Sequence, residues 1–259
     1  MLQILFIAII IGIAAMRMKD NTGVRRFLES ANALFVEAIR IVIDFISIAM
    51  FCTMATMIYT IGAESVAYMA GLALEIWVTD LSMMLLVYSA ILIIFGRINP
   101  IEFYKTLIPT LIMSVPTMSS NVMIPHTMQT CKKLGVSEKV YSFSIPLGAT
   151  VNMDASCIYM TLSVLFAMKC FDVPVDMETL LPVLFMLFVM SIGSPGVSGG
   201  SLAMMAILLP MLDIPATFVT FLTVAYSATA YILTPCNIAG DVVVTTVMAK
   251  RAGLYSKED

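Results

Sequence analysis

Two aspartates stand in the middle of strongly apolar parts of the sequence. Asp154 lies in segment 140–168 and Asp241 in segment 218–248, and neither segment contains a Lys or Arg. A bare carboxylate at such a place in a bilayer is costly, so it must be protonated, paired or neutralised by a bound cation. Oxygen ligands surround both aspartates in the sequence: Thr150, Asn152, Ser156, Thr234 and Asn237. Carboxylates with further oxygen ligands suit a hard cation, so the pattern predicts a cation site. The alternative is a packed core in which both aspartates are protonated or hydrogen-bonded to Ser and Thr.

The composition places these segments in a membrane. Of the 259 residues, 60% are hydrophobic and 12% are charged. A soluble domain carries about 25% charged residues, so this chain lacks the polar surface that a soluble enzyme needs. The net charge of −3 argues against nucleic acid as a partner. The single His126 and the five scattered cysteines form no CxxC or HExxH pattern, so no zinc or haem centre is predicted. The sequence therefore predicts an all-α, polytopic membrane protein embedded in the lipid bilayer.

The first three apolar segments are uninterrupted. Segment 2–16 is short against the ~20 residues of a membrane-spanning helix, and we expect a partial span there. Segments 34–61 and 66–95 are long enough to cross a bilayer. They predict two long helices joined by a short polar turn.

The later apolar segments are interrupted, and the interruption occurs twice in the same order. Segments 106–133 and 180–212 are broken near the middle by Pro, Gly, Ser or Asn, which leaves halves too short to span a bilayer. Each predicts a re-entrant hairpin, in which two half-length helices meet at a polar tip. Segments 140–168 and 218–248 come after the hairpins, and each predicts a transmembrane helix with a broken middle. Corresponding interrupted segments in two halves indicate a transporter binding site at the bilayer midplane.

The basic residues predict the topology. Most of the 14 Lys and Arg residues fall in four stretches, 17–26, 97–105, 132–139 and 250–257. The positive-inside rule assigns all four to the cytoplasm, which includes the C-terminus. With this assignment the two hairpins enter the membrane from opposite faces. The repeat of hairpin plus broken helix is therefore predicted to be inverted.

The hairpin tips predict where an anionic group would bind. A half-helix that begins at a tip presents free backbone N–H groups and a partial positive charge. Ser119 and Ser120 form one tip, and residues 198–201 (Ser-Gly-Gly-Ser) form the other. Such small residues let the backbone approach a ligand closely. Close packing between helices is the alternative explanation of the glycines.

Four motifs together resemble the dicarboxylate/amino acid:cation symporters, the sodium-coupled glutamate-transporter family. They are Ser119-Ser120-Asn121 with Pro125, the segment 142–154 ending in Asn152-Met153-Asp154, the hairpin Ser191-Ile192-Gly193-Ser194-x-Gly196-Val197, and Asn237-x-x-Gly240-Asp241. They occur in the family's order and cover nearly the whole chain. The resemblance implies an elevator-type transporter, usually a homotrimer, in which both hairpins and both broken helices form the moving domain. Residues 1–96 would contain partial scaffold helices and the start of the transport domain. Residues 97–249 would form the transport domain with both hairpins and both broken helices, and residues 250–259 a cytoplasmic tail.

The resemblance also implies roles for individual residues. One sodium site would consist of Gly148, Asn152, Asn237 and Asp241. A second would consist of Thr150, Ser191, Ile192 and Ser194, and a third would include Asn152 and Asp154. The substrate pocket would be lined by Ser120, Ser156, Val197, Thr234 and Asn237, with Asn237 and the first tip holding a carboxylate.

Two departures from the family pattern bear on the substrate. Amino-acid transporters of the family place an Asp seven residues before the asparagine of NxxGD, where this chain has Ala230. Members with acidic substrates place an Arg four residues before it, where this chain has Leu233. A buried guanidinium that pairs with a second carboxylate would be missing. We therefore expect a small organic solute such as a simple carboxylate, not an acidic amino acid.

The predicted function is secondary active transport, with sodium-coupled symport of this solute by a multi-pass protein of the plasma membrane. Sodium is the expected coupling ion, and coupling to protons stays open. Family members have about three further spans before a segment like 2–16. The first alternative is therefore a truncated, transport-inactive fragment, which would form a homotrimer only if the missing scaffold were supplied.

The second alternative is an enzyme, an intramembrane aspartyl protease with Asp154 and Asp241 as its catalytic pair. Two carboxylates that share a proton can do such chemistry. However, Met153 stands where the Tyr of the expected Tyr-Asp pair would be, and re-entrant hairpins have no role in such an enzyme. We therefore expect a protein that is not an enzyme.

Overall fold

The computed structural model describes residues 2–18, 20–44, 48, 51–52, 55–56, 58–59, 64–194, 196 and 198–256. Within these residues the secondary structure is helical, apart from one isolated bridge between Val136 and Tyr255. The prediction of an all-helical chain is therefore confirmed for this part. The chain divides into two compact units, Met1–Cys52 and Thr53–Asp259.

The first unit contains the helices α1 (Leu2–Arg17) and α2 (Thr22–Asp44). The first matches the predicted apolar segment 2–16. The second begins well before the predicted start at residue 34, because polar residues stabilise its first turns. The Asp20 carboxylate accepts a hydrogen bond from the Thr22 N–H at 3.0 Å, and Arg25 pairs with Glu29 one turn later at 2.8 Å. Much of the remaining segment, 45–61, lies outside the described residues.

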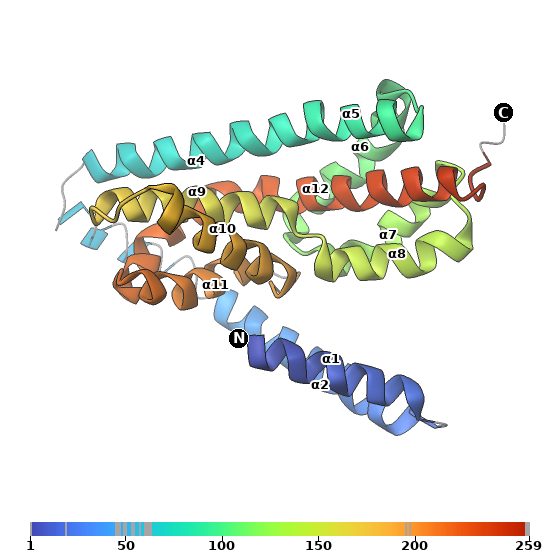
Figure 1. Ribbon diagram of the computed structural model, residues 1–259, viewed down its shortest axis with the longest axis horizontal. Coiled ribbons are helices and arrows are strands. Elements are labelled where there is room, and N and C mark those ends of the chain that lie inside the picture. Colours follow the sequence, from blue (N-terminus) through green and yellow to red (C-terminus); the bar gives the residue numbers. More distant parts are fainter. Residues whose placement is uncertain are drawn as a thin grey trace. The chain divides into compact units, whose positions relative to one another are not determined.

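The second unit opens with one long helical rod (Figure 1). It consists of α4 (Glu64–Ser82), the π-helical segment η1 (Met83–Tyr88), α5 (Ser89–Ile91) and the π-helical segment η2 (Leu92–Gly96). The stretch Val66–Gly96 is long and apolar enough to cross a membrane, as predicted for 66–95. Each π-turn widens the helix locally, a distortion often found at functional sites.

Two pairs of helices correspond to the predicted hairpins. The first pair is α6 (Pro100–Thr117) and α7 (Ser120–Lys133), which pack against each other. The second pair is α10 (Met177–Ile192) and α11 (Gly200–Leu208), and each of these two helices packs against α9 (Asp154–Cys170). The short 3-10 segments η3 (Leu209–Leu212) and η4 (Ala216–Phe218) lead on to the last helix. The helices α7 and α11 both begin at a tip, as predicted.

The two segments predicted as broken helices differ from each other. The first is broken: α8 (Glu138–Val151) ends at Asn152, and α9 begins at Asp154. The second is not broken, because α12 (Val219–Arg251) is one continuous helix through Pro235. The prediction of a broken helix over 218–248 is therefore wrong. A proline removes one N–H donor and crowds one carbonyl of the helix, and here dense packing holds the rest of the helix together.

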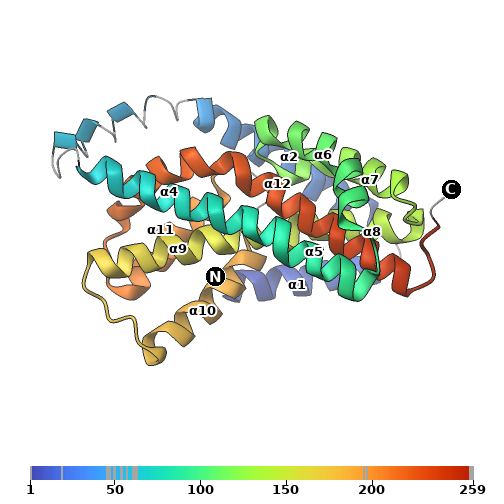
Figure 2. The same cartoon turned by 90° about the horizontal axis from the view of Figure 1, so that it is seen from above.

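That packing surrounds α12, which runs through the middle of the second unit (Figures 1 and 2). It contacts α4, α6, α7, α8 and α9. All residues from 232 to 243 are buried. The indole Nε1 of Trp77 donates to the carbonyl of Ala228 at 2.9 Å and ties α4 to α12. Helix α12 therefore carries its polar residues through the core of this unit.

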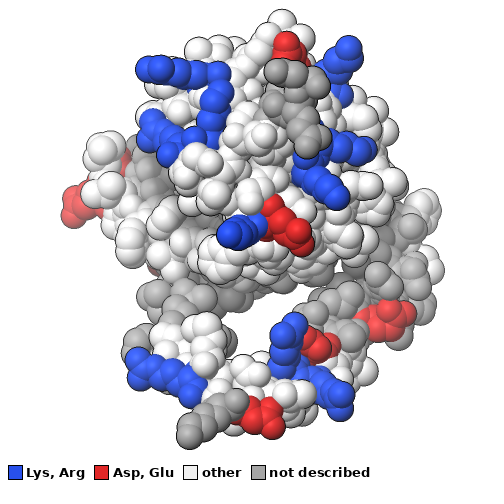
Figure 3. Space-filling view, turned by 90° about the vertical axis from the view of Figure 1, so that its right-hand side faces the viewer, with Lys and Arg blue, Asp and Glu red and all other residues white. Residues whose placement is uncertain are grey.

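Basic residues gather at one end of the second unit (Figure 3). The Lys250 ammonium donates to the carbonyl of Arg97 at 3.0 Å, and Arg251 Nε donates to the carbonyl of Phe95 at 3.2 Å. The Ser137 N–H donates to the carbonyl of Leu254 at 2.9 Å. Three of the four basic stretches of the sequence thus meet at the same end.

Candidate functional site

The break between α8 and α9 forms the centre of the site. Asn152 and Met153 have non-helical backbone angles, with ψ values of 77° and 58°. The N–H of Asn152 still bonds the carbonyl of Gly148 at 2.8 Å, which closes the last turn of α8. The break places Asn152 and Met153 between the two helices, directly before Asp154 at the start of α9.

The two predicted aspartates meet at this break. The Asn152 amide donates to Asp241 Oδ1 at 3.0 Å, which links α12 to the end of α8. The Tyr88 hydroxyl, from η1, donates to Asp154 Oδ2 at 2.7 Å. Asp241 is 4% exposed. Asp154, Asp241, Asn152 and Tyr88 therefore form one polar cluster, which we call the aspartate cluster.

Two glycines allow the aspartate cluster to form. A Cβ atom added to Gly148 would collide with the Asp241 carboxylate. A Cβ added to Gly240 would lie 2.7 Å from Tyr88 Oη and 2.8 Å from Asp154 Oδ2. Both glycines therefore let carboxylate oxygens approach a helix backbone more closely than any other residue would permit.

Asn237 joins α12 to the first turn of α9. Its Oδ1 accepts a hydrogen bond from the N–H of Ala155 at 2.8 Å, and its Nδ2 contacts Met153 Sδ at 3.4 Å. The first N–H groups of a helix have no partner within the helix. The Asn237 side chain supplies one such partner and fixes where α9 begins.

The two hairpin tips contact each other beside the break. The Ser119 hydroxyl donates to the carbonyl of Gly196 at 2.9 Å, and the N–H of Asn121 reaches the same carbonyl at 3.4 Å. A Cβ on Gly196 would lie 2.5 Å from the carbonyl oxygen of Ala149. The second tip is also held by Tyr226, whose hydroxyl accepts from the N–H of Gly199 at 2.7 Å.

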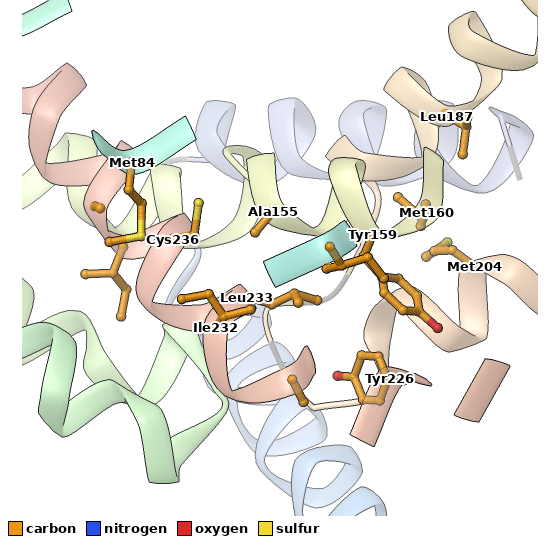
Figure 4. Packing of buried hydrophobic residues seen from close by; sticks show 14 of the residues in the cluster. Met84, Ala155, Tyr159, Met160, Leu187, Met204, Tyr226, Ile232, Leu233 and Cys236 are labelled. Carbon is orange, nitrogen blue, oxygen red and sulfur yellow. The ribbon is translucent and has the colours of Figure 1, made fainter. Parts of the chain in front are cut away.

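A small cavity lies between the tips, the break and α12. Its volume is about 20 Å³, room for a single water molecule. It is lined by Met118, Ser120, Met153, Ser156, Gly196, Ser201, Tyr226, Ala230, Leu233, Thr234 and Asn237. Tyr226 packs edge-on against Tyr159 at 5.3 Å between ring centroids, and Leu233 lies nearby in the same core (Figure 4).

The structure thus brings together four of the five residues predicted to line a substrate pocket: Ser120, Ser156, Thr234 and Asn237. The fifth, Val197, lies outside the described residues. Gly148, Asn152 and Asp241, predicted for one sodium site, also come together. Asp154 lies beside them, because its Oδ2 and the Asn152 amide both approach Gly240 closely. Within the part of the chain that the structure describes, no three His, Cys, Asp or Glu side chains gather as a metal centre. The polar groups here are two carboxylates with amide and hydroxyl groups.

The residues predicted for a second sodium site are less closely associated. Thr150 is exposed, and its hydroxyl donates to the carbonyl of Leu147 at 2.8 Å in its own helix. The Ser191 hydroxyl donates to the carbonyl of Phe188 at 2.8 Å, and Ile192 beside it is half-buried. Ser194 is 2% exposed, and its hydroxyl has no hydrogen-bond partner among the described residues.

Sequence reasoning missed Tyr88 and Met153. Tyr88 lies in an apolar run and carries no motif, so only the fold shows that it meets Asp154. Met153 lies within the Asn-Met-Asp motif, but nothing in its residue type indicates that it lines the cavity.

Comparisons with known proteins bear on the whole chain. The sequence profile described as "Sodium:dicarboxylate symporter family" matches residues 1–251. The chain is 26% identical to a proton/sodium-glutamate symport protein of Bacillus caldotenax, over all of this chain and 61% of that protein. It is 29% identical to a C4-dicarboxylate transport protein of Caulobacter vibrioides, over all of this chain and 62% of that protein. The chain therefore spans about three fifths of the length of these relatives.

Proposed function

Because the chain belongs to the sodium:dicarboxylate symporter family, we propose that it binds sodium and a small organic solute together and couples their movement across a membrane. The observation that carries the proposal is the position of the aspartate cluster beside the cavity. Met153 lines the cavity, and its chain neighbours Asn152 and Asp154 belong to the cluster. Family membership supports a protein of the transporter class and coupling to sodium or protons. The identity of the ion sites, the solute and the mechanism are proposed for this chain from its own residues.

Asp241 is the proposed centre of a sodium site. Its carboxylate is nearly buried, and it accepts a hydrogen bond from the neutral amide of Asn152. A buried charge needs compensation that an amide alone does not supply. Sodium, bound with the nearby backbone of Gly148 and the side chains of Asn152 and Asn237, would supply it. Sodium would also neutralise Asp154 in a third site, and Ser191, Ile192, Thr150 and Ser194 remain the proposal for a second one.

The proposed solute is a small carboxylate without a second acidic group. The N-termini of α7 and α11 begin at the two tips and would attract one carboxylate. Ala230 and Leu233 also line the cavity and offer neither an acidic nor a basic group. A solute with an ammonium or a second carboxylate would lose its charge partner there. Relatives are named for glutamate and C4-dicarboxylates, and we propose that this chain differs from them in substrate.

The proposed mechanism is movement of the hairpins, α8, α9 and α12 as one body. The contact between the tips and the links from α12 to the break would hold these elements together during such movement. An inverted arrangement of the hairpins, a cytoplasmic C-terminus in the plasma membrane and a homotrimeric assembly complete the proposal. The chain spans about three fifths of the length of these relatives. Ion binding is therefore tested before transport.

The test is sodium-dependent stabilisation of the purified full chain. A ligand that binds the native state raises its stability by RT ln(1 + [L]/Kd). Sodium should therefore raise the melting temperature of the wild type, and Asp241→Asn should abolish the rise. Asp176→Asn is the matched control, since Asp176 is exposed and caps α10 far along the chain from the cluster. Equal stabilisation by lithium, potassium and choline would show that the sodium site is wrong.

A further inference from the structure

Besides Asp241, the carboxylate of Asp80 is buried in the second unit, and it belongs neither to the aspartate cluster nor to the cavity. Asp80 lies on α4, inside the stretch Val66–Gly96 that is apolar and long enough to span a membrane. Its exposed fraction is 0%. Neither of its carboxylate oxygens has a hydrogen-bond partner among the described residues. Asp80 is thus a carboxylate that is shielded from solvent and has no protein donor to stabilise a negative charge.

Three elements pack against the helix that carries Asp80, and one thiol reaches its backbone. Helix α4 packs against α12, α9 and η1. From α12, the Cys236 thiol donates to the backbone carbonyl of Asp80 at 3.8 Å. From η1, the Tyr88 hydroxyl lies 4.0 Å from the same thiol and donates to Asp154 of α9. Among the described residues, these contacts connect Asp80 to three titratable groups of the packed elements, Cys236, Tyr88 and Asp154. Neither carboxylate oxygen of Asp80 has a Lys or Arg donor among the described residues.

These contacts decide between a proton and a metal cation. A hard cation needs several oxygen ligands at once. The side chain of Asp80 offers its own two oxygens, and neither of them contacts a hydrogen-bonding group among the described residues. The Cys236 thiol, which reaches the backbone carbonyl of Asp80, is a soft ligand. Isolated buried carboxylates become neutral by taking up a proton, because the cost of burying the bare charge is too high. The geometry therefore favours a proton.

We propose that Asp80 is a proton-binding site in the core of the second unit, separate from the aspartate cluster, and that it is a neutral carboxylic acid in this structure. The site stands without the proposed function. One consequence does rest on the proposed function: if the chain transports, proton release from Asp80 disfavours the packing of α4 on α12 and makes transport depend on pH. The proton would then act through the same helix that carries Asn237 and Asp241.

The experiment uses infrared difference spectroscopy of the full chain in lipid vesicles at neutral pH and saturating sodium. A protonated carboxyl group has a C=O stretch that an ionised carboxylate lacks. The spectrum of wild type minus Asp80→Asn should contain this band with the intensity of one group per chain. The exposed Asp176→Asn is the control and should show an ionised carboxylate instead. Asp80→Leu is the second variant, should the amide prevent folding.

Two results would overturn the proposal. The first is a difference spectrum that contains ionised carboxylate bands for Asp80. The second is an Asp80 carboxyl band that appears only when sodium is removed, because Asp80 would then be part of a cation site. Removing sodium separates this proposal from the proposed function. If the infrared bands of Asp154 and Asp241 do not change when sodium is removed, the proposed sodium site is wrong. The Asp80 band is expected in either case.

The pH dependence of unfolding gives a second measurement. An exposed aspartate in the unfolded chain is ionised above a pKa of about 4, so unfolding at neutral pH would release the proton of Asp80. The wild type should therefore lose melting temperature as the pH rises from mildly acidic to mildly alkaline. Asp80→Asn, which has no proton to release, should lose less. Equal slopes in the two proteins would contradict a protonated Asp80.

Discussion

Replacing Gly148 by Ala sets two physical effects against each other. Within a helix, Ala is more favourable than Gly by about 1 kcal/mol, so α8 alone would be stabilised. The added Cβ, however, would lie 2.8 Å from Asp241 Cγ and 3.3 Å from Oδ2. Overpacking of this kind costs about 1–3 kcal/mol. The carboxylate must move away from α8, and the hydrogen bond from Asn152 is strained or lost.

That displacement sets the magnitude of the effect. A hydrogen bond to a charged group contributes about 1.5–3 kcal/mol, and a tenfold change in affinity corresponds to about 1.4 kcal/mol. We therefore expect Gly148→Ala to weaken sodium binding at least about tenfold. At a sodium concentration of 100 times the wild-type Kd, sodium stabilises the wild type by about 2.7 kcal/mol. The variant should retain at most half of this, about 1.4 kcal/mol.

The assay is thermal unfolding over a sodium titration, with choline keeping the ionic strength constant. Gly71→Ala is the matched control, because Gly71 lies inside α4 and an added Cβ there meets no atom within 4 Å. The control should keep the full sodium effect and gain stability from helix propensity alone. If Gly148→Ala behaves like Gly71→Ala, with an unchanged sodium response, the close approach of Asp241 to α8 does not serve ion binding.

Two further predictions concern the second hairpin. Gly196→Ala should lower the melting temperature and make the tip more sensitive to protease, because its Cβ would lie 2.5 Å from the Ala149 carbonyl oxygen; Gly193→Ala, with no atom closer than 3.8 Å, should do neither. The backbone N–H of Thr179, and then its hydroxyl, hold the pKa of Asp176 below its usual range, so this cap stabilises α10 above about pH 4 and is lost as the pH falls through the lowered pKa. An NMR titration of Asp176 should show the lowered pKa, and a titration at the ordinary value would contradict the cap.

Much of the aspartate cluster could be predicted from the sequence, because its chemistry is local. Asn152 and Asp154 stand two residues apart in an apolar segment after Pro146 and Gly148, which predicts both the break and its polar lining. The same reasoning predicted hairpin tips at Ser119–Ser120 and near Gly200, where the structure begins α7 and α11. Spacing and polarity are therefore enough to predict the features that depend on a few neighbouring residues.

The continuity of α12 could not be read in the same way. Pro235 and Gly240 have low intrinsic helix propensity, as do Pro146 and Gly148. Propensity alone therefore predicts a break in both segments. Whether the backbone breaks depends on what surrounds it. Helix α12 packs against α4, α6, α7, α8, α9 and α11. Helix α8, by contrast, ends where Gly196 comes against its last turn. Tertiary packing decided between two similar local sequences.

Asp80 carries the same sequence signal as the two aspartates of the cluster, since it too lies in an apolar segment with no Lys or Arg. Thr79 and Ser82 stand beside it in the sequence, so oxygen-bearing neighbours alone do not separate Asp80 from Asp154 and Asp241. The fold is required to separate them, because only the fold shows that both oxygens of Asp80 lack partners among the described residues.

The arrangement around Met153 gives a physical reason why ion and solute binding should depend on each other. Met153 lines the cavity, and its two neighbours in the chain, Asn152 and Asp154, belong to the aspartate cluster. Asn237 lines the same cavity, and it holds the break on both sides of Asp154, because its Oδ1 accepts from the Ala155 N–H and its Nδ2 contacts Met153 Sδ. An ion that fixes Asn152 and Asp154 must also fix the backbone of Met153, because these three residues have few free torsions between two helix ends. The entropy of ordering this break is then lost once, when the first ligand binds, and the second ligand binds more tightly as a result.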